Sequence, residues 1–84
     1  MSTSTLLLQQ ANNGQAQVTP SRFPSEIIIQ YSPQGEAEAF YGVDGQAPGI
    51  KLAPGTTRVV INVNSLQLAY RTLNGEAKLQ WEVV

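Results

Sequence analysis

The stretch LQLAYRTLNGEAKLQWEV, residues 66–83, decides the fold class of this chain of 84 residues. At its centre lies the pair Asn74-Gly75, which favours a type I′ turn because both central residues of that turn need a positive φ. If the chain reverses there, the flanks become antiparallel strands whose register is set outward from the turn. One face of this predicted hairpin is apolar and the other polar, so one face is a core and the other is solvated.

The register of the hairpin predicts which residues share each face. The apolar cross-strand pairs are Tyr70 with Leu79, Leu68 with Trp81, and Leu66 with Val83. The polar face gathers Gln67, Arg71, Lys78, Gln80 and Glu82. A third strand is predicted over residues 56–63, joined to the hairpin by a turn at Asn64-Ser65. Its apolar face carries Val59, Ile61 and Val63. Residues 59–84 are therefore expected to form a three-stranded antiparallel sheet.

Turn signals divide the remaining chain into further short strands. The β-branched segment 26–31 is followed by a Ser-Pro-Gln-Gly turn at residues 32–35, and residues 36–43 should return antiparallel to it. Pro48-Gly49 and Pro54-Gly55 bracket a strand of at most four residues, which suits a sheet edge. No segment has a convincing helical period. The sequence predicts an all-β fold, an antiparallel β-sandwich or jelly-roll-like barrel of about seven to eight short strands.

The first 24 residues allow two interpretations. Asn13-Gly14 can close a second hairpin between residues 3–10 and 15–19. Alternatively, residues 1–24 form a partly extended amino-terminal arm, because the returning half is mostly Gln and Ala. In both cases residues 1–84 are expected to form a single domain, since a chain of this length lies near the lower limit for one hydrophobic core.

Composition excludes most kinds of catalytic or metal centre. Cys and His are absent, which removes disulfides and the usual zinc, haem and iron–sulfur ligands, so we expect no metal and no cofactor. Glu36 and Glu38 share a face, but solvent-facing positions explain them, and Ser or Thr has no His to activate it. The sequence therefore predicts a protein that is not an enzyme.

Charge and segment lengths exclude several classes of partner. A net charge of -1 and scattered basic residues give no electrostatic basis for binding nucleic acid or an anionic membrane. The first residues lack both the basic region and the long apolar stretch of a signal peptide, and no stretch is long enough for a membrane span. We expect the chain in the cytoplasm that translates it, or in a particle assembled there.

Three apolar triplets break the alternation expected of a solvated antiparallel strand. They are Leu6-Leu7-Leu8, Ile27-Ile28-Ile29 and Val59-Val60-Ile61. If the flanking residues fill the core, Leu7, Ile28 and Val60 emerge on the outer face of their sheet. Either loops cover them, or they contact another subunit or a host scaffold, because soluble monomers seldom expose a large apolar patch. The charged fraction of 13% favours an interface, since interface cores are depleted in charge.

A second set of candidates would contact a ligand. One of Phe40 and Tyr41 must face outward from a regular strand, where an aromatic ring suits a carbohydrate. Arg71 and Lys78 would lie directly opposite each other on the polar face of the predicted hairpin, where two like charges can hold an anion or an acidic partner. A simply solvated face is the alternative explanation for this pair.

Several features of the whole chain occur together: no Cys or His, many Gln, Asn, Ser and Thr residues, Pro-Gly turns, an extended polar amino-terminal segment and a last strand that reaches Val84. In these features the chain resembles the small β-domains that decorate or cement bacteriophage capsids or fit into phage tails. The resemblance is one of style without a shared motif, so it assigns no functional residues. It implies a homotrimer or another symmetric assembly on a protein lattice, located in the virion, with Leu6 to Gln17 as an arm that reaches a neighbour.

The function that these observations favour is that of a non-enzymatic structural subunit that binds and stabilises a larger symmetric assembly. Its partners would be copies of itself and a capsid or tail scaffold protein. The alternative is an adhesin-like β-sandwich that binds a carbohydrate or another ligand in loops near residues 33–35 and 44–49. An inhibitor that blocks a host protein also fits the size of the chain.

Overall fold

A computed structural model of the chain describes residues 2–8, by their strand pairing, and residues 13–84. These residues form eight strands in two antiparallel sheets of four, which confirms the predicted all-β class. Sheet A has the order β1 (Ser2–Leu8), β8 (Ala77–Val83), β3 (Ser25–Pro33) and β6 (Gly55–Ile61). Sheet B has the order β2 (Asn13–Val18), β7 (Leu66–Asn74), β4 (Glu36–Gly42) and β5 (Ile50–Lys51). The described residues include no helix that could cross a membrane.

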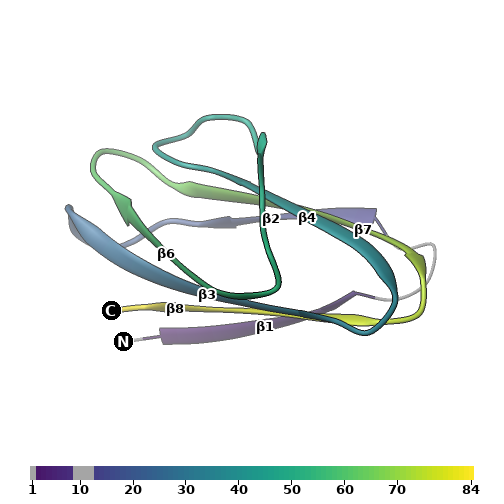
Figure 1. Cartoon of the computed structure of the whole chain (residues 1–84). Helices are drawn as coiled ribbons and strands as arrows, with labels where there is room; N and C mark the ends of the chain where they lie inside the picture. Colours follow the sequence, from purple (N-terminus) through teal and green to yellow (C-terminus); the bar gives the residue numbers. More distant parts are fainter. Residues whose placement is uncertain (1, 9–12) are drawn as a thin grey trace.

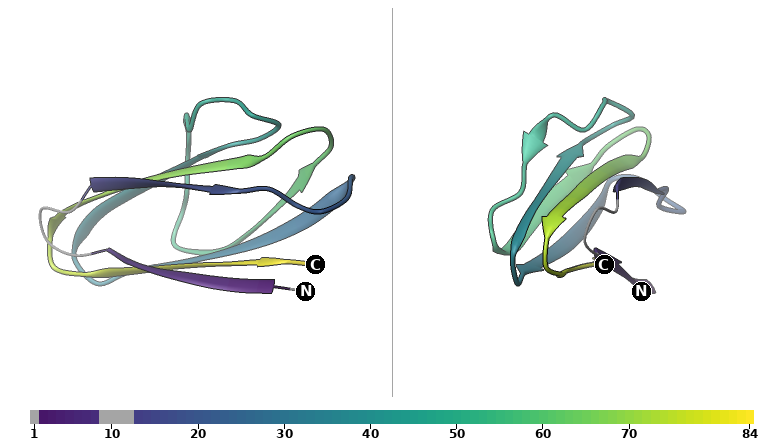
Figure 2. Two further views of the ribbon diagram at one scale, coloured as in Figure 1. Left: turned by 180° about the vertical axis from the view of Figure 1, so that it is seen from behind. Right: turned by 90° about the vertical axis from the view of Figure 1, so that its right-hand side faces the viewer.

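The strand order is that of a jelly roll. β1 pairs with β8, β2 with β7, β3 with β6 and β4 with β5, all antiparallel. The chain therefore has the topology of one long antiparallel hairpin, in which β1 to β4 pair with β8 to β5 and the chain reverses between β4 and β5. This hairpin is folded over on itself to form the two layers. The first and last strands lie side by side, and both termini emerge at one end of the molecule (Figure 1). The end-on view shows the two layers (Figure 2).

The core lies between the sheets and is built from the inward face of each layer. Among residues 13–84, twelve buried apolar residues form one cluster. They are Val18, Ile27, Ile29, Tyr31, Ala39, Leu52, Val59, Ile61, Leu66, Leu68, Ala77 and Leu79. Tyr70, Trp81 and Val83 pack against this cluster. The inward faces predicted for residues 66–83 are therefore confirmed, as are those of Val59 and Ile61.

The lateral pairing predicted for the last three strands is wrong. β7 and β8 lie in opposite sheets, so Asn74-Gly75 is a crossover between layers and not the turn of a hairpin. Gly75 has a φ of 87°, but Asp44 is the one non-glycine residue with a positive φ among those described, so Asn74 does not fit a type I′ turn. The alternation of apolar and polar residues along a strand predicts which side chains enter the core. That alternation is the same whether the next strand in sequence lies beside it in the same sheet or across the core in the other sheet.

The same error affects the other predicted turns. β3 and β4 lie in different sheets although the turn between them is where the sequence places it, and β6 and β7 are likewise separated. Asn13-Gly14 begins β2 and pairs with Arg71 and Tyr70, so the hairpin predicted there is wrong. Val63 was expected in the core but is 74% exposed, because β6 ends at Ile61 and the chain then crosses to the other sheet.

Two crossovers support each other at the end opposite the termini. The amide N–H of Gln34 donates a hydrogen bond to the carbonyl oxygen of Glu76 at 2.7 Å. A Cβ atom on Gly35 would lie 2.2 Å from the carbonyl oxygen of Asn74. The 34–35 and 74–75 turns therefore contact each other through their backbones, and Gly35 has no room for a side chain.

We predict that Gly35→Ala lowers the free energy of unfolding by about 1–3 kcal/mol, because one of the two turns must move away from the other. Gly49→Ala is the matched control, since its Cβ would meet nothing closer than 3.8 Å and it should change stability by less than about 0.5 kcal/mol. Urea denaturation of both variants measures the difference. Equal stability of the two variants would contradict the close contact between the two turns.

Tyr31 is a polar exception inside the core. It points inward from β3, is 3% exposed, and its hydroxyl group has no hydrogen-bond partner among the described residues. Burial raises the pKa of this phenol, and the charge of Glu38 raises it further. The hydroxyl is thus neutral and unpaired, and its burial costs desolvation free energy.

We predict that Tyr31→Phe leaves the domain as stable as the parent chain or raises its unfolding free energy by about 1 kcal/mol, because the ring stays and an unpaired hydroxyl is removed. Urea denaturation at neutral pH is the measurement. A clear loss of stability would mean that the hydroxyl makes a hydrogen bond in solution.

Candidate functional site

The outer face of sheet A carries two of the three residues predicted to form an interface. Inward Ile27 and Ile29 are fully buried, so Ile28 between them points outward and is half-buried. On the neighbouring edge strand β6, Val60 also points outward and is 51% exposed. Val60 pairs with Glu26, and Ile28 with Arg58, so the two apolar residues are diagonal neighbours on one surface.

Val84 extends this apolar surface. Its amide N–H donates a hydrogen bond to the carbonyl oxygen of Glu26 at 2.9 Å, which continues the β8 ladder by one residue. Val83 packs against the core, so Val84 points outward, and it is 60% exposed. We call Ile28, Val60 and Val84 the sheet A patch.

Arg58 is the one charged residue of β6, and a neighbouring carboxylate neutralises its charge beside the sheet A patch. The guanidinium group of Arg58 forms an ion pair with the carboxylate of Glu26, and both side chains remain well exposed. Charged side chains on an edge strand normally discourage pairing with a further strand. Here the charge is balanced within the face, so it protects the free edge of β6 poorly.

Leu7, the third predicted interface residue, does not join the sheet A patch. It lies on β1, the other edge strand of sheet A, opposite Lys78 of β8. β8 separates β1 from β3, and Ile28 pairs with Glu82, four residues along β8 from Lys78. The side chain of Leu7 lies outside the part of the chain that the structure describes.

The ligand candidates are divided among three surfaces. Phe40 points outward from sheet B, whereas Tyr41 packs against the core. Arg71 also lies on the outer face of sheet B, and its Nη2 donates to Glu38 Oε2 at 3.1 Å. Lys78 lies on sheet A, in the opposite layer, so the predicted pair of Arg71 and Lys78 is wrong. The structure brings Phe40 and Arg71 together.

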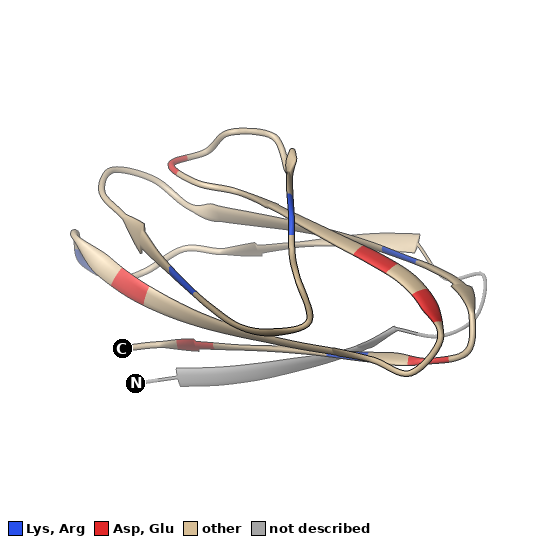
Figure 3. Cartoon of the chain, in the orientation of Figure 1, with Lys and Arg blue, Asp and Glu red and all other residues tan. Residues whose placement is uncertain are grey.

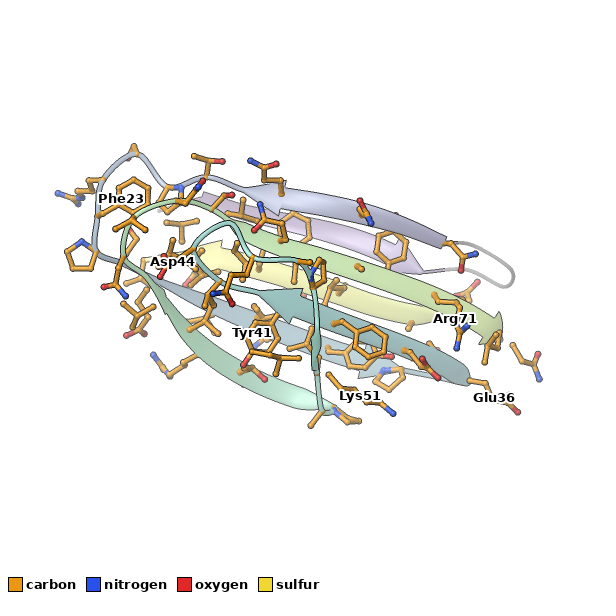
Figure 4. The ribbon with its side chains drawn as sticks, turned by 90° about the horizontal axis from the view of Figure 1, so that it is seen from above. Phe23, Glu36, Tyr41, Asp44, Lys51 and Arg71 are labelled. Atoms are coloured by element: carbon orange, nitrogen blue, oxygen red, sulfur yellow. The ribbon has the colours of Figure 1, made fainter. Side chains whose placement is uncertain are left out.

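Phe40 and Arg71 border an open hollow of about 570 Å³ on the outer face of sheet B. Its lining comes from the central strand β7 and from its neighbours β2 and β4. The lining residues are Asn13, Gly14, Gln15, Glu38, Phe40, Ala69, Tyr70 and Arg71. Figure 4 looks onto this layer, with Arg71 towards one end and Phe23 and Asp44 towards the other.

Loops meet at the end of the sandwich that carries the termini. Asp44 Oδ1 accepts the backbone N–H groups of Asn62 at 2.7 Å and of Val63 at 3.1 Å. The N–H of Gly45 donates to the carbonyl oxygen of Ser65 at 2.9 Å. Asp44 and Gly45 form a turn, and these hydrogen bonds tie the β4–β5 loop to the β6–β7 loop. Two backbone donors hold the pKa of the Asp44 carboxyl below its usual range.

The part of the chain that the structure describes contains no candidate metal site. Among residues 13–84 and the strand 2–8, no three carboxylates lie close enough to hold a metal ion. Charged residues are dispersed over the described strands and do not gather on one face (Figure 3). Comparisons with protein-family models, curated proteins and solved structures give no match to this chain. Its function must therefore be argued from its own surfaces.

Sequence reasoning missed several residues of these surfaces. Glu38 was expected to be simply solvated, but it is the partner of Arg71. Ala69 and Gln15 were not singled out, although an alanine at an outward position between Gln67 and Arg71 signals a gap in a polar face. Alternation alone predicts that outward position. That β2 and β4 flank it depends on the strand order, which the sequence did not reveal.

The lowered pKa of Asp44 makes stability depend on pH in a defined direction. Its carboxylate stabilises the folded chain fully above the ordinary aspartate pKa of about 3.9, and this contribution is lost as the pH falls through the lower pKa of the folded state. We predict that the parent chain is more stable than Asp44→Asn at neutral pH and that the difference shrinks below about pH 4. Urea midpoints between neutral and acidic pH measure it. A difference that stays constant on acidification would contradict the assigned role of Asp44.

Proposed function

We propose that this chain is a non-enzymatic structural subunit that associates with copies of itself and stabilises a larger symmetric protein assembly. The observation that carries the proposal is the open edge strand β6 together with the sheet A patch, whose three outward apolar side chains lie among the charged residues Glu26, Arg58 and Glu82. Among assemblies of this kind, the resemblance in composition favours a bacteriophage capsid or tail, which would locate the chain in the virion.

The edges of the two sheets differ in their protection. β5, an edge of sheet B, has two residues and lies between Pro48 and Pro54, so it offers little to a further strand. β6, an edge of sheet A, has seven residues without proline, and no described strand pairs with its outer side. A seven-residue edge supplies backbone donors and acceptors to another chain.

A second copy of the chain is the occupant that this edge fits. Pairing of β6 with β6 around a two-fold axis places the same surface on both sides, as a closed symmetric interface requires. Val60, on the edge strand itself, then lies at the seam between the two copies. Ile28 and Val84 lie further from the seam on the same outer face, where they are available to a scaffold protein. Many modest contacts of this kind, repeated by symmetry, become collectively strong.

Light scattering of the purified chain tests the proposal. We predict a defined oligomer whose mass does not change with salt, because apolar and backbone contacts are hardly screened. Val60→Lys should shift it to the monomer, because Glu26 is already paired with Arg58 and the charge of the added lysine stays uncompensated on the edge strand.

Leu73→Lys is the matched control. Leu73 is 49% exposed, as Val60 is 51% exposed, but it lies on β7 at the other end of the sandwich. This variant should keep the oligomer. A parent chain that stays monomeric at high concentration, or an oligomer that both variants dissolve equally, would reject the sheet A patch as the interface.

A further inference from the structure

The hollow on sheet B has a neighbour on the outer face of that sheet. This second hollow has a volume of about 270 Å³, and Gln15 borders both hollows. The second hollow is lined by Gln15, Ala16, Gln17, Pro48, Gln67 and Leu68. We call the two hollows together the sheet B groove. It faces away from sheet A, so the proposed interface at β6 leaves it open.

The width of the groove is set by Ala69. In the register, Ala69 lies between Gln15 of β2 and Phe40 of β4, so the three side chains form one row across the sheet. The outer two strands of this row are roughly 9–10 Å apart. Because the central side chain is a single methyl group, the row forms a trough with Phe40 as one wall and Gln15 as the other.

The row of outward side chains two residues further along β7 closes one end of the trough with hydrogen-bonding groups. It contains Asn13, Arg71 and Glu38, in that order across the three strands. The ion pair between Arg71 and Glu38 holds both side chains in place and leaves no net charge there. Further N–H donors of the guanidinium group and the second carboxylate oxygen are available to a ligand.

Amide side chains continue along the opposite wall. Asn13, Gln15 and Gln17 are exposed on one side of β2, spaced by roughly 6.7 Å. Each amide offers both a donor and an acceptor, which is the combination that a sugar hydroxyl also offers. In the second hollow, Gln67 Nε2 donates to Ser65 Oγ at 2.6 Å, so that side chain is fixed before any ligand binds.

We propose that the sheet B groove binds a neutral saccharide. A pyranose ring lies in the trough over Ala69, with its apolar C–H face against the ring of Phe40. Its hydroxyl groups bond to the Arg71–Glu38 pair and to the amides of Asn13 and Gln15. A second sugar unit extends towards Gln67. This function is additional to assembly and does not depend on it.

The chemistry of the groove disfavours other ligand classes. Glu38 neutralises Arg71, so the residues that line the hollow carry no excess positive charge for a phosphate, a sulfated sugar or a nucleic acid. Lys51 lies opposite Phe40 on β5, beyond the wall of the trough and outside this lining. Proline-rich peptides bind in grooves lined by several aromatic residues. Only Phe40 and Tyr70 among the aromatic residues line this hollow, and Tyr70 packs against the core. The first hollow alone, at about 570 Å³, falls within the ~300–1,000 Å³ typical of small-molecule sites.

The test is a titration of the ¹⁵N-labelled chain, followed by NMR, with glucose, galactose, mannose and N-acetylglucosamine at high concentration and with their neutral oligosaccharides. We expect shifts of the backbone amides of Gln15, Phe40, Ala69 and Arg71 and of the side-chain amides of Asn13 and Gln15. A sialylated and a sulfated oligosaccharide and a proline-rich peptide are titrated in parallel. Absence of shifts with every neutral sugar, or shifts at these residues with only the anionic sugars or the peptide, overturns the proposal.

Variants at Phe40 separate stacking from fold. Phe40→Ala and Phe40→Leu should weaken the best neutral ligand about tenfold, which corresponds to about 1.4 kcal/mol, and Phe40→Trp should keep its affinity. Lys78→Ala, an exposed change on sheet A, is the control and should bind as the parent does. An NMR spectrum with unchanged dispersion verifies that each variant is folded. If Phe40→Leu binds as tightly as the parent, or Lys78→Ala weakens binding equally, the saccharide does not lie in the groove. Oligomer mass is measured separately, so either proposal can fail alone.

Discussion

The packing of sheet A against sheet B is the interaction on which the rest of this structure depends. A chain of 84 residues buries a smaller fraction of its surface than a larger domain does, and this one has no cysteine to add a disulfide. Its stability therefore depends on the cluster between the layers, to which residues 13–84 contribute twelve buried side chains. In a domain stable by about 5–15 kcal/mol, the loss of one such side chain is a large fraction of the total. The inward positions are committed to the core, which leaves the outer faces, the edges and the loops for function.

Alternation in the sequence was sufficient to predict these inward positions. Ile27, Ile29, Leu66, Leu68 and Leu79 were placed correctly on the core side, because each strand of a two-layer protein must present one apolar face. The prediction of a short edge strand between Pro48 and Pro54 was also correct, because a proline has no backbone N–H to donate and so ends a strand where it stands. These features are local, and local chemistry encodes them.

The partner of each strand is not a local property, and the sequence did not predict it. A strand with an apolar face satisfies the same pattern beside its neighbour in a hairpin or across the core from it. The jelly roll is selected by contacts between distant turns, such as the backbone contact of Gly35 with Asn74. In the sequence, Gly35 is an ordinary turn residue. Only the folded structure shows that a side chain at this position would collide with the 74–75 crossover. For the same reason the sequence predicted that Arg71 lies opposite Lys78, and it did not predict that Arg71 pairs with Glu38.

The two outer faces have different characters, and the difference gives the domain a coherent use. Sheet A carries three outward apolar side chains at one end and is open at its β6 edge, which favours pairing between chains. Sheet B presents a neutral groove with one aromatic wall and a row of amides, which favours a small polar ligand at modest affinity. A single open groove with one stacking ring binds weakly. A symmetric assembly built through sheet A would repeat that groove many times in one orientation, and multivalency would convert weak single contacts into firm attachment to a surface that carries many copies of the sugar. The strength of such attachment would then depend on the oligomer, whereas the affinity of one groove would not.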